Sequence, residues 1–214
     1  MEEKRSRLNI AGAGLAALAV LAAVGIAAEP AFAACVNTTE VSVDAVFKGS
    51  KCTTWKSVTY QGTYAYLKDG ETLTGTLRKI TKNGESSVTK QGNVQGKNFT
   101  GSLTSDAQHL AGGVVNSNET REGTEQLDPE GTFSGTSRVA RRGDELYTNK
   151  YGRIESKAFT GSLTSDAQHL AGGVVNANIV MEGTWPIKNR TFVGTLRISQ
   201  RGSEVFVDDR RTEQ

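Results

Sequence analysis

Two histidines, His109 and His169, are the only histidines of the chain, and they occupy the same place in two copies of one segment. Residues 99–116 recur without a change at 159–176, so eighteen positions are identical at a spacing of sixty. Neutral imidazole is a common ligand of transition metals and of haem iron. The pair would hold a metal or haem iron if the fold brought the two copies together; otherwise both are exposed polar residues. The polar neighbours that complete this candidate ligand-binding set are Asp106, Gln108, Asp166 and Gln168.

The same segment also contains the residue types of a catalytic triad, since Ser105 and Asp106 precede His109. Triads are normally assembled from distant parts of the chain, whereas adjacent Ser, Asp and His residues are typical of turns. No cysteine, second histidine or carboxylate cluster in the sequence completes a metal site around either histidine. The sequence therefore predicts a non-enzymatic protein without a cofactor, with a metal or haem at His109 and His169 as the alternative.

Aromatic residues provide a second group of candidate ligand contacts. Trp55 and Trp185 are the two tryptophans, and Tyr60, Tyr64 and Tyr66 lie near the first of them. Aromatic side chains are enriched in binding sites because they offer a large contact area with few rotatable bonds. Packing in the core would explain these residues equally well, so both interpretations remain open.

The first part of the chain has the features of a signal peptide. Three basic residues precede an apolar run over 11–28, and Ala31-Phe32-Ala33 is a typical cleavage site. We expect residues 1–33 to be removed, which leaves no transmembrane segment. The protein is accordingly expected to be secreted, periplasmic or attached to the cell surface.

Cys35 and Cys52 are the only cysteines, and both lie just after the predicted cleavage site. In an exported protein, an even pair at short spacing favours one disulfide. The alternative is that Phe32-Ala33-Ala34-Cys35, which resembles a bacterial lipobox with Phe in place of the usual Leu, is lipidated at Cys35. Lipidation would leave Cys52 unpaired.

The repeat defines the domain organisation. Residues 34–71 are expected to form N-terminal strands that carry the disulfide, and 72–214 a repeat-built β domain with units 72–131 and 132–191 and a partial unit 192–214. The net charge of the whole chain is only +2, and basic residues alternate with acidic ones. This pattern does not favour a nucleic-acid partner.

Alternation of apolar and polar residues predicts an all-β fold. In 99–104 one face carries Phe99, Gly101 and Leu103 and the other carries polar residues, as in an antiparallel sheet with one wetted face. An aromatic ring can cover such a mid-strand glycine, which also lets the sheet bend. We expect about four strands per unit, hairpin turns at Asn83-Gly84 and its equivalents, and a longer polar connection over 104–109. The predicted architecture is an up-and-down meander that closes into a soluble β-barrel, with a β-sandwich or a repeat-built sheet as alternatives.

These residues also resemble a known family. Phe133-Ser134-Gly135-Thr136, Phe159-Thr160-Gly161 and the run 166–174 are similar to the barrel lobes of bacterial transferrin-binding-protein-like surface proteins. The chain lacks the aromatic residue and the proline that are typical of that family's turn. The resemblance implies a secreted or surface-attached binding protein, with iron or haem acquisition as the expected role.

The sequence thus favours an exported binding protein that recognises a protein or a small ligand. The duplicated segments 105–113 and 165–173 are the expected contact regions. The alternative function is a structural or adhesive protein that self-associates through its repeats. An open sheet edge would favour self-association, whereas a closed barrel with a lined cavity would favour ligand binding.

Overall fold

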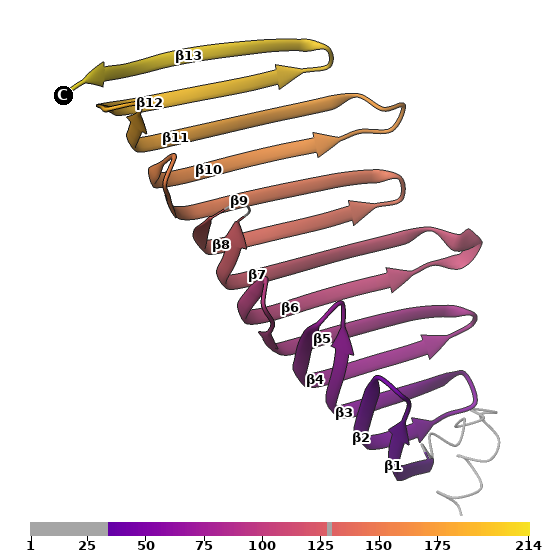
Figure 1. Ribbon diagram of the computed structural model, residues 1–214. Helices are drawn as coiled ribbons and strands as arrows, with labels where there is room; N and C mark the ends of the chain where they lie inside the picture. Colours follow the sequence, from indigo (N-terminus) through magenta and orange to yellow (C-terminus); the bar gives the residue numbers. More distant parts are fainter. Residues whose placement is uncertain (1–33, 128–129) are drawn as a thin grey trace, which may run out of the picture. The chain divides into compact units, whose positions relative to one another are not determined.

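The computed structural model describes residues 34–127 and 130–214, so the predicted signal peptide lies outside the described residues. The described chain forms one antiparallel sheet in which thirteen strands follow one another in sequence order (Figure 1). A short 3₁₀ turn, η1 (Ala111–Gly113), connects β6 to β7. No helix within the described ranges is long and apolar enough to cross a membrane. The strands are β1 (Ala34–Val41), β2 (Ala45–Thr53), β3 (Ser57–Lys68), β4 (Glu71–Lys82), β5 (Glu85–Gln95), β6 (Phe99–His109), β7 (Val115–Leu127), β8 (Gly131–Arg142), β9 (Glu145–Ser156), β10 (Thr160–His169), β11 (Val175–Ile187), β12 (Arg190–Arg201) and β13 (Glu204–Glu213).

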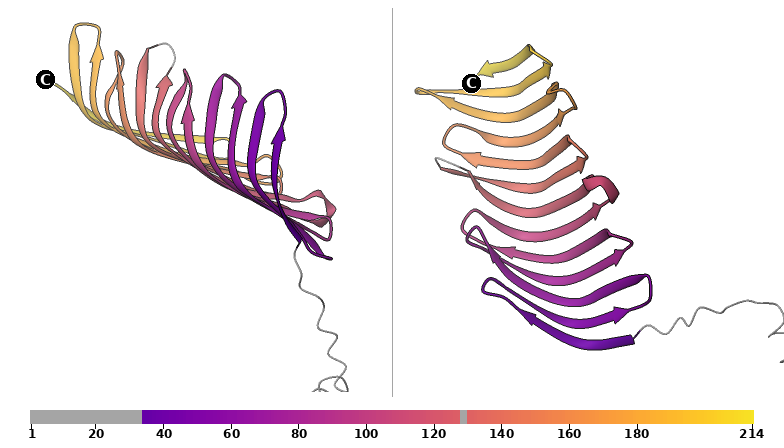
Figure 2. Two further views of the ribbon diagram at one scale, coloured as in Figure 1. Left: turned by 90° about the horizontal axis from the view of Figure 1, so that it is seen from below. Right: turned by 90° about the vertical axis from the view of Figure 1, so that its right-hand side faces the viewer.

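The predicted all-β antiparallel meander is confirmed, but its predicted closure into a barrel is not. β1 pairs only with β2, and β13 pairs only with β12, so the sheet is open at both ends. The described strands also form a single layer and not a sandwich. Each strand bends part-way along its length, so the sheet folds over one of its own faces (Figure 2). Because this bend shelters apolar side chains, the sheet hides them without closing.

The local turn predictions are confirmed. Asn83 and Gly84 both have positive φ, of 51° and 81°, and they connect β4 to β5 as a two-residue hairpin. Gly143 and Gly202 begin the equivalent turns after β8 and β12, with φ of 58° and 59°. Each repeat unit contributes four strands, β4–β7 and β8–β11.

The prediction of a polar connection over 104–109 is wrong. These residues continue β6 to His109, and the equivalent residues continue β10 to His169. Polar side chains on a strand still allow its backbone to pair, and Asp106 pairs with both Thr89 and Asn118. The actual connection lies further along, at 110–114, where Gly112 and Gly113 adopt positive φ.

A line of glycines causes the bend. Every strand from β2 to β12 carries a glycine, and ten of these form five facing pairs in which the backbones of neighbouring strands approach closely. At Gly75, an added Cβ would lie 2.1 Å from the carbonyl oxygen of Gln91 and 2.5 Å from the Cα of Gly92. In a flat sheet the Cβ points away from the neighbouring backbone, so this approach means that the sheet folds over its glycine-bearing face. The pairs are Gly49–Gly62, Gly75–Gly92, Gly101–Gly123, Gly135–Gly152 and Gly161–Gly183.

The line of glycines crosses the strands obliquely. Gly62 faces Leu77, two residues along β4 from Gly75. The same two-residue step separates Gly92 from Gly101 and Gly152 from Gly161, whereas Gly123 faces Gly135 directly. Because the register shifts by two residues or by none, all the paired glycines stay on the same face of the sheet. We call this glycine-bearing face the inner face and the opposite one the outer face.

Aromatic rings cover the glycines on the inner face, as the sequence predicts. A Cβ at Gly152 would lie 2.9 Å from the Phe133 ring, and one at Gly161 would lie 2.7 Å from the Phe159 ring. The core therefore lies within the bend. Its main cluster consists of Tyr64, Leu73, Val94, Phe99 and Leu103, with Tyr66 and Leu77 packed against it.

The predicted disulfide is present. Cys35 and Cys52 face each other in the register of β1 and β2, with their Cα atoms 4.0 Å apart, and form a disulfide bond. The bond ties the first strand of the sheet to the second.

We predict that Gly75→Ala destabilises the sheet by about 3 kcal/mol or more, because two backbones would have to separate to admit the methyl group. Gly84→Ala is the control: nothing lies within 4 Å of its added Cβ, so only the positive φ of 81° opposes it, at about 1 kcal/mol. Urea denaturation of both variants would measure the difference. An equal loss in the two variants would contradict the close approach at Gly75.

Candidate functional site

Positively charged side chains lie over aromatic rings along the inner face. The ammonium of Lys90 lies 4.7 Å from the Tyr66 ring centre, and the guanidinium of Arg121 lies 5.4 Å from that of Phe99. Such cation–π contacts contribute about 0.5–1 kcal/mol at exposed sites and more when they are desolvated. Two further pairs follow along the sheet: Lys150 with Phe133 at 5.5 Å and Arg211 with Trp185 at 5.0 Å.

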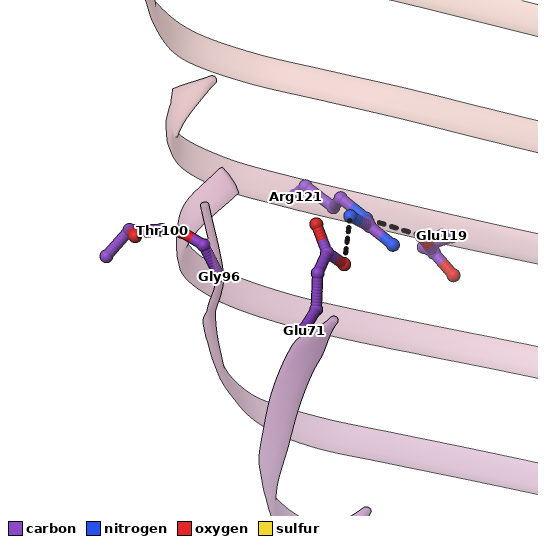
Figure 3. A network of polar contacts seen from close by, with 5 residues as sticks. All are labelled: Glu71, Gly96, Thr100, Glu119 and Arg121. Carbon is purple, nitrogen blue, oxygen red and sulfur yellow. Dashed lines mark hydrogen bonds and ion pairs between the residues drawn. The ribbon is translucent and has the colours of Figure 1, made fainter. Parts of the chain in front are cut away.

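Arg121 is held by two carboxylates. It donates to Oε2 of Glu71 at 3.2 Å and to Oε1 of Glu119 at 2.8 Å, as Figure 3 shows. Glu71 comes from β4, and its side chain lies against Gly96. An added Cβ at Gly96 would lie only 2.7 Å from the Glu71 Cγ. Burial of the guanidinium lowers the pKa of Arg121, but the hydrogen bonds and charges of both glutamates outweigh this effect and raise it. Arg121 is therefore a structural cation with its charge satisfied.

Two of the other inner-face cations are also paired. The Lys150 ammonium donates to Oε2 of Glu125 at 2.7 Å. Arg211 donates through Nε to Oδ1 of Asp209 at 2.7 Å, and this hydrogen bond is the main cause that lowers the pKa of Asp209. Neither cation is left with an unmet charge.

Lys90 is different, because no carboxylate among the described residues forms an ion pair with it. Burial lowers its pKa below the ordinary lysine value of 10.5, and the neighbouring charge of Lys68 lowers it further. The charge of Glu119 opposes this shift only in part. Lys90 and Lys150 occupy equivalent positions of the two repeat units, so the same residue is paired in one unit and unpaired in the other.

A hollow of about 660 Å³ adjoins Lys90 on the inner face. This volume lies within the range of small-molecule sites. Phe47, Tyr64, Tyr66 and Leu77 provide apolar walls, and Lys90 provides a positive charge. The hydroxyl of Tyr64 is buried, and no hydrogen-bond partner for it exists among the described residues. Burial raises the pKa of Tyr64 above 10.0, so the hydroxyl keeps its proton and can donate.

The structure does not bring the two histidines together. His109 ends β6 and His169 ends β10, with β7, β8 and β9 between them. Four steps between neighbouring strands separate them by about 19 Å, which is far beyond the reach of a shared metal ion. In the part of the chain that the structure describes, no group of three or more histidine, cysteine and carboxylate side chains is placed to hold a metal.

Asp106 and His109 lie on opposite faces of β6, because alternate residues of a strand point to opposite sides. Asp166 and His169 are separated in the same way on β10. The carboxylate is thus unable to orient the imidazole of its own segment, as a triad would require. The structure instead places Asp106 and Gln108 together on the outer face, and does the same with Asp166 and Gln168.

The two tryptophans have contrasting positions. Trp55 lies in the turn between β2 and β3 and is 85% exposed. Trp185 is buried on the inner face, where its ring centre lies 4.7 Å from that of Phe159. Trp185 is thus a core residue, and Trp55 does not line the hollow beside Lys90.

Sequence reasoning named Tyr64 and Tyr66 as candidate contacts but missed Lys90, Leu77 and Phe47. The available signal was the repeat, which aligns Lys90 with Lys150 within a diverged flank. That signal marks the position, but it does not reveal that only Lys150 has an acidic partner.

Comparison of the chain with protein-family models, with curated proteins and with solved structures finds no match in any of the three.

Lys90→Met and Lys150→Met test the contrast between these equivalent lysines. We expect Lys90→Met to keep or raise the thermal midpoint, because it removes a desolvated charge that has no carboxylate partner, and the methionine side chain can still pack against the Tyr66 ring. Lys150→Met should lower the stability by up to about 1 kcal/mol, because it leaves Glu125 without its cation. Thermal melts followed by circular dichroism would measure both. A lower midpoint for Lys90→Met than for Lys150→Met would show that Lys90 serves the fold.

Proposed function

We propose that this chain is a non-enzymatic exported binding protein that takes a small anionic ligand with a flat apolar body into the hollow beside Lys90. The observation that carries this proposal is an ammonium without an ion-pair partner in an aromatic hollow that Tyr64 also lines, together with the buried Tyr64 hydroxyl, which has no hydrogen-bond partner among the described residues. Buried polar groups normally have partners, so the unmet Tyr64 hydroxyl close to a half-buried ammonium favours an absent acceptor.

A carboxylate is the acceptor that suits both groups. It would accept charge-assisted hydrogen bonds from Lys90 and a hydrogen bond from Tyr64, while a flat ring would pack between Phe47 and Tyr66. Glu40 and Asp44 also line the hollow, and they disfavour ligands with negative charge at that side. The proposed ligand therefore carries its charge at one end and is apolar at the other.

Export is supported by the signal-peptide features of the sequence and by the disulfide, since disulfides persist in oxidising compartments. The resemblance to surface binding proteins points the same way. Porphyrins combine a flat ring with carboxylates, so a role in haem acquisition is one form of this proposal. Such a role would use Lys90 and Tyr64 and not His109 and His169.

Metal-free protoporphyrin IX and 2-naphthoate are suitable probes, with binding followed by fluorescence. We expect Lys90→Met to weaken binding by about 10- to 100-fold and Tyr64→Phe by about 10-fold, as for hydrogen bonds to charged and neutral groups. Lys150→Met should bind as the unchanged protein does. Binding that survives Lys90→Met, or that is lost equally in Lys150→Met, would contradict the proposal.

The pH dependence provides an independent check. Because the pKa of Lys90 is lowered, its ammonium loses its proton at a lower pH than an ordinary lysine. Binding of 2-naphthoate should therefore weaken as the pH rises towards 10.5, the ordinary lysine value. Lys90→Arg should remain charged and keep its affinity across this range. A flat profile for the unchanged protein would argue against a role of the ammonium.

The second candidate function is self-association, which the open edges of the sheet favour. β13 leaves one side unpaired and exposes Val205, Phe206 and Val207 at 59%, 55% and 63%. Exposed apolar edge strands are templates for pairing with another chain. Light scattering over a hundredfold concentration range should show growth into larger species, and Phe206→Lys should abolish it. A monomer at all concentrations would exclude this candidate.

A further inference from the structure

The duplicated segment builds two equivalent polar hollows on the outer face of the sheet, away from the hollow beside Lys90. The first, of about 200 Å³, lies across β6, β7 and β8. The second, of about 230 Å³, lies across β10, β11 and β12. Both contain an aspartate, a glutamine, two asparagines and an arginine at matching positions, while Ser117 and Arg141 also line the first and Gln200 also lines the second. The matching sets are Asp106, Gln108, Asn116, Asn118 and Arg142 in the first, and Asp166, Gln168, Asn176, Asn178 and Arg201 in the second.

The arginine occupies the same position in both hollows, although its spacing along the chain differs by one residue from that of the other matching residues. Arg142 faces Asn116 in the sheet register, and Arg201 faces Asn176. These arginines are 59 residues apart, whereas the other matching residues are 60 apart. The connection between β11 and β12 is one residue shorter than that between β7 and β8, which restores the register. The same constellation therefore exists twice despite divergent flanking strands.

A continuous path on the outer face joins the two hollows. In the register, Asn118 faces Ala140, Ala140 faces Tyr147, Tyr147 faces Gln168, and Gln168 faces Asn176. Tyr147 thus lies between the two polar sets. Its hydroxyl donates to Oε2 of Glu145 at 2.6 Å, which fixes the side chain. The path consists of polar groups at both ends and an aromatic ring between them.

The composition of each hollow selects the chemistry of a ligand. In each hollow the matching carboxylate and guanidinium balance each other, so neither an anion nor a cation is favoured by this set. The first hollow has a second guanidinium, that of Arg141, which donates through Nε to the carbonyl oxygen of Gly143. Three side-chain amides each offer both donors and acceptors. Hydroxyl groups, which also donate and accept, complement this arrangement. The Tyr147 ring, over which the Arg142 guanidinium lies at 5.8 Å from the ring centre, provides an aromatic surface beside the polar groups.

We propose that the outer face binds a linear neutral oligosaccharide that occupies both hollows and crosses Tyr147. Asp106 and Asp166 are four strand steps apart, about 19 Å across the sheet, so a single extended chain reaches both. Two linked binding events then reinforce each other through a high effective concentration. This site is independent of the one proposed for Lys90, and either can exist without the other.

The test begins with the purified protein on an array of neutral and charged oligosaccharides. The best neutral hexasaccharide and the disaccharide of the same linkage are then titrated by calorimetry. We expect two disaccharides to bind per chain but only one hexasaccharide, with about 100-fold higher affinity for the longer ligand. Asp106→Ala and Asp166→Ala should each leave one disaccharide site and reduce hexasaccharide affinity to the disaccharide level.

Two further variants test whether binding depends on the path between the two hollows and not on other parts of the surface. Tyr147→Ala should weaken the hexasaccharide while leaving the disaccharide unchanged, because the ring lies between the hollows. Asn93→Ala is the control, since Asn93 is an exposed polar residue of β5 outside both hollows. Circular dichroism melts confirm that each variant is folded before it is titrated.

Three outcomes would overturn the proposal. The first is the absence of binding to any neutral oligosaccharide on the array. The second is binding of anionic oligosaccharides alone, which would point to the cations of the inner face. The third is a stoichiometry of one disaccharide per chain, or a loss of hexasaccharide affinity in only one of Asp106→Ala and Asp166→Ala, because both hollows must contribute.

Discussion

The close approach of two backbones at each glycine pair is the constraint on which the structure depends. At Gly92 an added Cβ would lie only 2.0 Å from the carbonyl oxygen of Thr74, so no other residue fits without moving a strand. The resulting bend turns one face of a single layer into a sheltered surface. Aromatic rings fill the space above the glycines, and cations lie over several of these rings. The bend thus creates both the core and the hollow beside Lys90.

In a single bent layer the two faces differ in role: the inner face contains the core, and the outer face is exposed. Only eight apolar side chains within the described ranges are buried, and all of them lie on the inner face. Each of these side chains therefore contributes a large share of the hydrophobic stabilisation. Each strand pairs only with its neighbours in sequence, so stability should be approximately a sum of local terms, as in repeat proteins. The outer face contributes little to the core, which leaves the duplicated polar residues around Asp106 and Asp166 available for binding.

Sequence reasoning identified the features that are determined by residues close together in the sequence. Asn83-Gly84 specifies its hairpin through positive φ, and alternation specifies which face of β6 carries Phe99. Closure was not predictable in this way, because no local pattern decides whether β13 meets β1. The strand over 104–109 was missed because its polar side chains resemble a turn, although its backbone is fully paired. The unpaired state of Lys90 depends on which acids neighbouring strands supply, and spacing in the chain does not encode that.

Nuclear magnetic resonance of the glycine α-protons tests the central claim most directly. Phe133 lies over Gly135 and Gly152, so their inward α-protons should be shifted strongly upfield by the ring. Contacts between α-protons should join Gly75 to Gly92, and no contact should join β1 to β13. Glycine shifts near random-coil values, or contacts between β1 and β13, would contradict a sheet that is open and bent at its paired glycines.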